Sequence, residues 1–323
     1  MKNNGLACSV KMIYFYCPDF VPPSGGIQKM YLQVDVLNRN GFPAAIVHTQ
    51  AGFRCNWFNN QTRILYGENV RPGANDFVVV PEVAGPHMAR NGPGIRKVIF
   101  NQNCYNTFRS YPIDPLEPET PYHSPDVVAV ITVSEDSAAY LRHAFPNQLV
   151  LRIRGSVDPA LFHPETKQRQ IAFMSRRHHE EAGQVFNILR FRGALADFKI
   201  AEIRDLSQGQ AAAILRQSAI FFSFSAIEGF GLPPAEAMLS GCVTIGFHGR
   251  GGKEFFLPEF SYPIEFGDIL GFAQAAEAVL NQYRHDPAPL IKQTEIAARY
   301  IAENYSSAIE EAGIVECWRQ IAG

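Results

Sequence analysis

The sequence of 323 residues lacks a charge imbalance, a long apolar run and a clustered basic region. Its formal net charge is -2, and neither half carries the basic face that nucleic-acid binding requires. No apolar run reaches the roughly 18 residues that cross a bilayer, and the polar start (residues 1–9) is too short for a signal peptide. We therefore expect a cytoplasmic protein that binds no nucleic acid.

Closely spaced cysteines are also missing. The sequence has no C-x-x-C pair, which argues against a structural zinc site or a dithiol redox motif. Free thiols in a reducing compartment are the simplest interpretation. The six cysteines lie far apart, at Cys8, Cys17, Cys55, Cys104, Cys242 and Cys317.

Short apolar runs alternate with amphipathic segments along most of the chain, a pattern that predicts parallel sheets covered by helices. Strands are expected at residues 10–17, 43–49, 76–82, 96–102, 126–134, 170–175, 198–204, 219–225 and 242–247. Helices are expected at residues 27–41, 135–145 (capped by Ser134), 178–190 and 207–217, and through most of the last fifty residues, with a break near Asp286.

The alternation pauses at residues 154–170, where two prolines, a glycine and several charges predict a hinge. The fold class is therefore α/β, with two doubly wound, Rossmann-like domains. A ligand of such domains binds in the crevice outside the carboxyl ends of the strands.

Two glycine loops lie between an expected strand and an expected helix. Gly25 and Gly26 open the first helix, where backbone amides favour an anion, although such a pair is more often a simple turn. In the second loop, EGFGLPPAE, the strand should end near Ser225, so that Glu228 lies in the loop and Glu236 one turn into the next helix.

The carboxylates of Glu228 and Glu236 would both face the carboxyl ends of the strands. There they would accept hydrogen bonds from the hydroxyls of a polyol. The spacing alone favours a chance arrangement, with one glutamate on the surface and one that is favourable for the helix dipole. The loop is not the G-x-G-x-x-G dinucleotide fingerprint, because Pro234 stands where the third glycine belongs, and a hydride-transfer enzyme is therefore disfavoured.

Several segments together resemble a known family. EGFGLPPAEAMLSGCVTIGFHGRGGKEF resembles the donor site of retaining GT-B glycosyltransferases of family 4 (glycosyltransferase group 1), which pairs a Glu-x7-Glu motif with a G-G-x-x-E loop. ITVSEDSAAYL and GSVDPALFHP resemble the end of that family's first domain and its linker. The resemblance covers most of residues 10–320 and implies two domains facing across a cleft.

The resemblance also implies domain bounds and residue roles. Residues 1–155 would form the acceptor-side domain and residues 156–302 the donor domain, with a helix at 303–323 packing back onto the first. Catalytic roles would fall to Glu228, which contacts the donor sugar, and to Arg176 and Arg177, which hold the diphosphate. The implied donor-binding residues are Gly25, Gly26, Phe230, Gly231, Leu232, Glu236 and Lys253, and the implied acceptor-side residues are Asn101, Gln102 and Asn103.

Glu236 would hold the nucleotide ribose, and the backbone of 230–232 would line the sugar and phosphate. The family's diphosphate-binding lysine has no counterpart in FMSRRHHEEAG. Either His178 or His179 of that segment, or the distant Lys253, would substitute for it, or the site would be weakened. In the G-G-x-x-E loop, Gly251, Gly252 and Glu254 match only with the glycines shifted next to Lys253.

The implied activity is transfer of a sugar from a UDP- or GDP-linked donor to a saccharide or lipid-linked acceptor. Configuration would be retained, no metal or other cofactor would be needed, and contact with a membrane would at most be peripheral. A GT-B subunit that binds a nucleotide sugar or a partner without turnover is the alternative, and a sugar-nucleotide epimerase is disfavoured by the Glu-x7-Glu motif.

Overall fold

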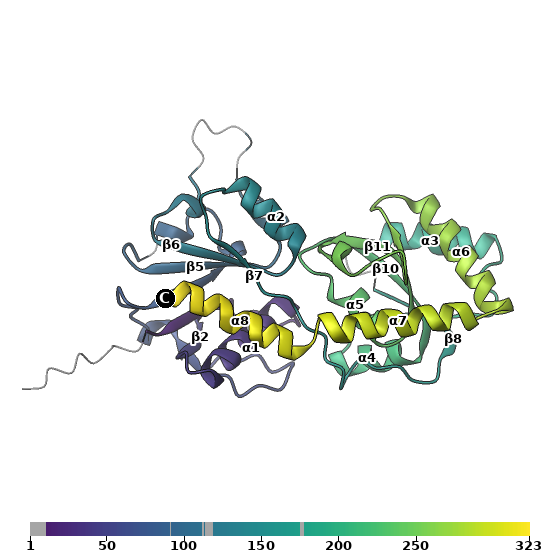
Figure 1. Cartoon of the computed structure of the whole chain (residues 1–323), viewed down its shortest axis with the longest axis horizontal. Coiled ribbons are helices and arrows are strands. Elements are labelled where there is room, and N and C mark those ends of the chain that lie inside the picture. The colour runs from purple at the N-terminus through teal and green to yellow at the C-terminus, as the bar shows by residue number, and fades with distance from the viewer. Residues whose placement is uncertain (1–10, 91, 112, 114–118, 175–177) are drawn as a thin grey trace, which may run out of the picture. The chain divides into compact units, whose positions relative to one another are not determined.

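A computed structural model describes residues 11–90, 92–111, 113, 119–174 and 178–323. The chain divides into two compact units, which Figure 1 colours along the chain. Unit 1 comprises Met1–Thr132, Ala138–Ile153 and Glu311–Gly323. Unit 2 comprises Val133–Ser137 and Arg154–Glu310.

Unit 1 is built on a seven-stranded sheet in the order β3-β2-β1-β4-β5-β6-β7, with every neighbouring pair parallel. The strands are β1 (Ile13–Tyr16), β2 (Ala44–His48), β3 (Ile64–Tyr66), β4 (Phe77–Pro81), β5 (Arg96–Asn101), β6 (Val127–Thr132) and β7 (Val150–Arg152). Along the chain, β2 and β3 are added on one side of β1, and β4 to β7 are then added on its other side. The topological switch point, where a ligand of such a sheet binds, therefore lies between β1 and β4.

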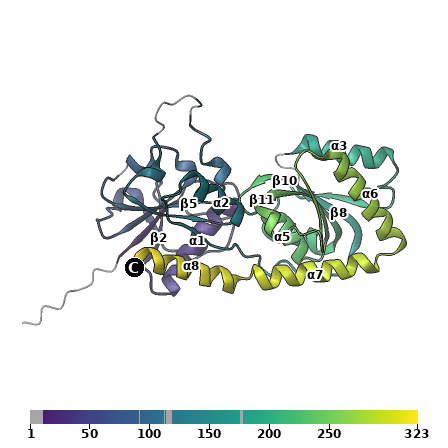
Figure 2. The same cartoon turned by 45° about the horizontal axis from the view of Figure 1, so that its top comes forward.

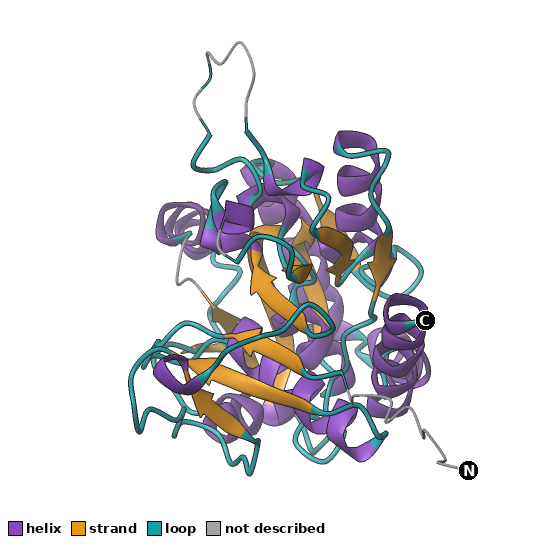
Figure 3. Cartoon of the chain, turned by 90° about the vertical axis from the view of Figure 1, so that its left-hand side faces the viewer, coloured by secondary structure: helices purple, strands orange, loops and turns teal. Residues whose placement is uncertain are grey.

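Three helices cover this sheet, and their apolar faces explain why. In α1 (Gly25–Arg39), Met30, Val34 and Leu37 recur at helical spacing and are all buried. The helix α2 (Glu135–Ala144) begins as predicted, because Ser134 Oγ accepts a hydrogen bond of 3.2 Å from the Ser137 amide. Figure 3 separates these helices from the strands by colour.

The third helix, α8 (Ser307–Ala322), belongs to unit 1 from Glu311 onward. Its Trp318 is fully buried, with ring centroids 6.1 Å from Phe15 of β1 and 5.7 Å from Phe77 of β4. A hydrogen bond of 2.9 Å from Arg39 of α1 to Glu311 holds the start of that segment. The core of unit 1 thus includes residues from both ends of the described sequence.

Unit 2 is built on a five-stranded sheet in the order β12-β11-β10-β8-β9, also parallel throughout. Its strands are β8 (Gln168–Met174), β9 (Lys199–Glu202), β10 (Ser218–Glu228), β11 (Val243–Arg250) and β12 (Tyr262–Ile264). Its helices are α3 (His179–Phe191), α4 (Gln208–Gln217), α5 (Leu232–Leu239), α6 (Ile269–His285) and α7 (Ala288–Asn304). Here the switch point lies between β8 and β10.

Alternation along β10 divides the core of unit 2 into two layers. Phe221 points into a cluster with residues of α4, α5 and α7, whereas Ile220 and Phe222 point into a second cluster with residues of α3 and α6. Figure 2 shows α3 and α6 on one side of β8 and β10, and α5 and α7 on the other. Helices on both faces explain why these strands read as continuous apolar runs.

The structure confirms the predicted α/β class and all nine predicted strands, and it adds three that were missed. The missed strands, β3, β7 and β12, have three residues each and lie at sheet edges. One boundary prediction was wrong: β10 continues past Ser225 to Glu228, through a register shift against β11. Glu228 is therefore the last strand residue and does not lie in the following loop.

Candidate functional site

The candidate site of unit 2 lies where β10 ends, at the switch point of the sheet. Glu228 closes β10, is half-buried, and pairs in register with Arg250 at the end of β11. Glu236 is the fifth residue of α5, the helix that follows, and it is also half-buried. Arg176 and Arg177, which come shortly after β8 in the sequence, lie outside the described residues.

The loop between Glu228 and α5 has a conformation that its residues specify. Gly231 is the N-cap of α5 at φ 88° and ψ 64°, a left-handed conformation that favours glycine. Pro233 and Pro234 occupy the first turn, where helix amides have no intrahelical partner, so the missing N–H costs little. No side chain caps this helix end, although the amides of a helix N-terminus favour an anion.

Aromatic packing holds that loop from beneath. The side chain of Phe230 is buried, with ring centroids 5.1 Å from Phe255 and 5.3 Å from Tyr305. Gly155 also lies against it, since a Cβ there would be 3.5 Å from the Phe230 ring. Phe230 therefore fixes the backbone of the loop, and its ring itself lies in the core.

The loops after β10 and β11 touch through two glycines. A Cβ on Gly251 would be 2.1 Å from the carbonyl oxygen of Gly229, closer than real Cβ atoms approach. Gly251 begins a short 3₁₀ turn (Gly251–Glu254) directly after Arg250. Glycine at this position lets the loops that directly follow Glu228 and Arg250 touch through their backbones.

Charged side chains gather at the ends of β11 and β12. Glu265 follows β12 and lies 3.4 Å from Lys253 Nζ and 3.3 Å from His248 Nε2. The hydrogen bond with His248 lowers the pKa of the Glu265 carboxyl, and burial lowers the pKa of His248. Lys253 is thus paired with a carboxylate in this structure.

Glu254 of the G-G-x-x-E-like loop has a structural setting. Its Oε1 accepts a hydrogen bond of 3.1 Å from the hydroxyl of Tyr305, and its carbonyl accepts one of 3.1 Å from the hydroxyl of Tyr300. Both tyrosines lie at the end of α7 or directly after it. These bonds tie the 3₁₀ turn to the helical layer of unit 2.

The histidines after β8 also have partners. His178 Nδ1 lies 3.6 Å from Glu181 in the first turn of α3. His179 Nδ1 lies 2.9 Å from Arg204 Nη2, and the same guanidinium nitrogen donates to Glu202 at 2.5 Å. Arg204 is therefore shared between two side chains that follow or end neighbouring strands.

In unit 1 the switch point brings together some of the predicted acceptor-side residues. Gly26, in the first turn of α1, is close to Gln102, because a Cβ there would be 3.1 Å from the Gln102 amide. Glu82, which the sequence analysis missed, follows β4 and accepts a hydrogen bond of 3.2 Å from the Gln102 backbone. Burial raises the pKa of this Glu82 carboxyl, the kind of perturbation that is frequent at functional sites.

The other two predicted acceptor-side residues have structural partners. Asn101 is fully buried, and its amide donates hydrogen bonds of 2.8 Å to Thr107 and to the Tyr122 hydroxyl. Asn103 caps a 3₁₀ turn by accepting from the Tyr105 amide at 3.1 Å. Of the three side chains, Gln102 is the one that the structure places beside the glycine loop.

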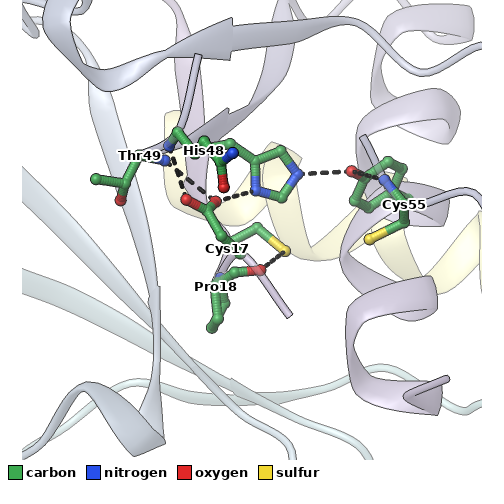
Figure 4. Close-up of polar contacts among 8 residues, drawn as sticks. Cys17, Pro18, His48, Thr49 and Cys55 are labelled. Carbon is green, nitrogen blue, oxygen red and sulfur yellow. Dashed lines mark hydrogen bonds and ion pairs between the residues drawn. The ribbon is translucent and has the colours of Figure 1, made fainter. Parts of the chain in front are cut away.

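A buried relay joins three elements at the carboxyl edge of the first sheet (Figure 4). His48, the last residue of β2, lies 2.6 Å from the Tyr31 hydroxyl of α1 through Nε2 and 2.8 Å from Asp19 through Nδ1. Asp19 also accepts hydrogen bonds from the backbone amides of Thr49 and Gln50. The relay therefore fixes the loop after β1 to the loop after β2.

Beside this relay lies a pocket of about 340 Å³, lined by residues 50–56 and by Val21. Val21 and its neighbour Phe20 expose 68% and 48% of their surface, so the loop after β1 presents apolar side chains outward. Burial raises the pKa of the Cys17 thiol to about 12, which makes that group a poor nucleophile despite its place at the edge.

Two features are absent from the described residues. No helix among them is both long and apolar enough to cross a membrane. Within the same residues, no group of three or more His, Cys, Asp or Glu side chains is arranged to hold a metal ion. The described cysteines are all buried free thiols, and Cys8 lies outside the described part.

Comparison with known proteins defines the fold. No protein-family model matches the chain. A curated relative, the alpha-1,6-glucosyltransferase of Actinobacillus pleuropneumoniae serotype 7 (strain AP76), is 26% identical over 262 residues, which are 77% of this chain and 75% of that protein.

Among solved structures, sucrose-phosphate synthase from Thermosynechococcus elongatus matches with a TM-score of 0.70 at 13% identity, covering 96% of this chain and 98% of that one. The pneumococcal O-GlcNAc transferase GtfA, solved with UDP and GlcNAc, matches with a TM-score of 0.63 at 12% identity, covering 97% of this chain and 99% of that one. Together with the two parallel sheets, these likenesses confirm the predicted GT-B fold.

Proposed function

We propose that this chain is a glycosyltransferase that moves a sugar from a nucleotide-diphosphate donor to a saccharide or lipid-linked acceptor. The observation that carries the proposal is the position of Glu228, which ends β10 at the switch point of unit 2, directly before the glycine loop and α5. A switch point is where doubly wound sheets bind their ligands. The curated relative is named as a glucosyltransferase, which supports the same class of reaction.

In the proposed site, Glu228 accepts hydrogen bonds from hydroxyls of the donor sugar and Glu236 accepts them from the ribose. The departing nucleoside diphosphate gains negative charge, which backbone amides at the start of α5 and nearby cations stabilise. Arg176 and Arg177 are proposed as two of those cations. Donor-binding roles are also proposed for Gly25 and Gly26.

We further propose that the reaction retains configuration by attack on the same face of the sugar, assisted by the leaving phosphate, and needs no metal ion. In that mechanism Glu228 orients the donor and forms no covalent bond to it. The donor base is proposed as uracil or guanine, and UDP in the GtfA structure supports the first. We also propose that the acceptor-side domain ends at residue 155, and that the donor domain extends from residue 156 to residue 302.

The acceptor is proposed to bind on the first unit, near Gln102. The amide of Gln102 lies against Gly26, and the buried carboxyl of Glu82 holds the Gln102 backbone in place. A lipid-linked acceptor, or peripheral contact with a membrane, is supported by the exposed Phe20 and Val21 after β1. A purely saccharide acceptor needs no such apolar surface.

The proposal is tested by incubating the protein with UDP- and GDP-linked sugars and measuring release of the nucleoside diphosphate. We expect slow hydrolysis of one donor, reduced at least about a hundredfold in Glu228→Gln, since orientation and charge placement commonly contribute that much. Glu295→Gln, which removes an exposed glutamate of α7, is the matched control and should leave the rate unchanged.

The alternative function is a GT-B subunit that binds a nucleotide sugar without turnover. It would be favoured by tight binding of a nucleoside diphosphate together with no release from any donor or acceptor tested. Equal hydrolysis by the unmodified protein and Glu228→Gln would contradict the proposed role of Glu228. No binding of any nucleoside diphosphate would contradict the proposed function itself.

A further inference from the structure

Arg250 has a backbone conformation that an arginine does not favour. It lies at φ 65° and ψ -73°, and it is one of two non-glycine residues with positive φ in the described part of the chain. Side chains other than hydrogen are strained there, whereas glycine adopts positive φ freely. Strained residues of this kind persist where the surrounding structure enforces them, and they cluster at functional sites.

Arg250 interrupts a run of glycines, the residue type that would adopt this conformation without strain. The residue before it, Gly249, and the two residues after it, Gly251 and Gly252, are all glycines. A fourth glycine at position 250 would relieve the strain and continue the run. The arginine therefore lowers the stability of the fold at this position. A residue that is kept in spite of such a cost is expected to have a function.

The guanidinium of Arg250 is exposed, and within the described residues it has no hydrogen bond and no ion pair. Other cations near this edge of unit 2 do have partners. Lys253 lies 3.4 Å from Glu265, and Arg204 donates to Glu202 at 2.5 Å. Among these three cations, Arg250 is the one whose charge is not already neutralised by a carboxylate.

The position of Arg250 relates it to the proposed donor site. It ends β11 and pairs in register with Glu228, which ends the neighbouring strand β10. Neighbouring strands lie about 4.8 Å apart, a distance that an arginine side chain readily spans. The contact between Gly251 and the Gly229 carbonyl keeps the two loops together. A ligand held by Glu228 is thus within reach of this guanidinium.

A guanidinium recognises phosphate especially well. It presents two parallel N–H donors to two phosphate oxygens, and its charge is permanent at neutral pH. We propose that Arg250 binds the diphosphate of the donor, beside the sugar-binding Glu228. This inference rests on the proposed function and names a phosphate contact at the end of β11.

The test compares binding of UDP and of uridine, which differ by the diphosphate alone, and repeats it with GDP and guanosine. Arg250→Ala should weaken nucleoside diphosphate binding about tenfold or more, the effect of one charge-assisted contact, and leave nucleoside binding unchanged. Arg250→Lys should recover part of the loss, because it restores the charge without the paired donors. Arg299→Ala removes an exposed arginine of α7 and is the matched control.

Arg250→Gly separates the functional role from a structural one. Relief of the strain should raise the melting temperature of the unliganded protein while the affinity for the nucleoside diphosphate falls. If Arg250 had only a structural role, Arg250→Gly would lower the melting temperature. It would then also weaken binding of the nucleoside and of its diphosphate equally.

The inference is overturned if Arg250→Ala binds the nucleoside diphosphate as the unmodified protein does, or if it loses the nucleoside equally. In either case binding by the unmodified protein leaves the proposed function standing. If the unmodified protein binds neither UDP nor GDP in calorimetry, the proposed function fails and the role of Arg250 fails with it.

Discussion

Replacing Gly251 by alanine tests whether contact between two loops organises the candidate site. The added Cβ would be 2.1 Å from the Gly229 carbonyl oxygen and 2.5 Å from its carbonyl carbon. Both neighbours are backbone atoms, so no flexible side chain can move aside. The added Cβ would lie roughly 1 Å or more inside van der Waals contact distance, so the loops that directly follow Glu228 and Arg250 must separate by about that much.

Gly251→Ala should reduce both the stability of the protein and its rate of donor hydrolysis. Overpacking of this kind typically destabilises by about 1–3 kcal/mol. For a unit of this size, each kcal/mol lowers the melting temperature by roughly 2–4 °C. A displacement of about 1 Å at a reacting centre can also reduce the rate about a hundredfold. We therefore expect a modest loss of stability together with a large loss of donor hydrolysis.

Gly183→Ala is the matched control within unit 2. Gly183 lies inside α3, and a Cβ there would meet no heavy atom within 4 Å. Alanine in a helix interior should stabilise by about 0.5–1 kcal/mol relative to glycine. Calorimetry and donor hydrolysis on both variants complete the assay. If Gly251→Ala melts and turns over as the unmodified protein does, the two loops are not held by this contact and our reasoning is refuted.

Two further predictions concern stability. Burial lowers the pKa of His48, so its contribution to stability is complete above the unfolded value of about 6.5 and is lost as pH falls from there toward the lower folded value. His48→Gln should therefore flatten the dependence of melting temperature on pH in that window, and an unchanged slope would contradict this. Lys167 donates to the backbone carbonyls of Leu215, Arg216 and Ser240, so Lys167→Met should cost about 3 kcal/mol, while UDP affinity is retained. A melting temperature equal to that of the unmodified protein would show that these bonds contribute nothing net.

Much of the fold could be predicted from the sequence because the strands of both sheets are covered on both faces. Runs such as 126–134 and 219–225 are apolar throughout, and the segments between them have helical periodicity. The edge strands β3, β7 and β12 were missed because three residues, most of them with half-exposed side chains, leave no such run. The end of β10 was misplaced because a register shift lets the strand continue beyond its apolar core to Glu228.

The candidate site was only partly visible in the sequence. Glu228 and Glu236 are close in sequence, so their spacing could be recognised. The relay of Asp19, Tyr31 and His48 could not, since these residues meet only because β1 and β2 pair in parallel and α1 packs beside them. The strain at Arg250 was hidden as well, because a positive φ at a non-glycine residue is imposed by its neighbours and has no signature in residue type.

The division of α8 between the units has a consequence for the order in which the chain folds during synthesis. Unit 1 contains Glu311–Gly323, and Trp318 fills the space between Phe15 and Phe77 in its core. A ribosome releases residues 154–310 before it releases that tryptophan. The core of unit 1 therefore cannot be completed until the last residues of unit 2 have also been made, so unit 1 must remain incompletely packed throughout the synthesis of unit 2.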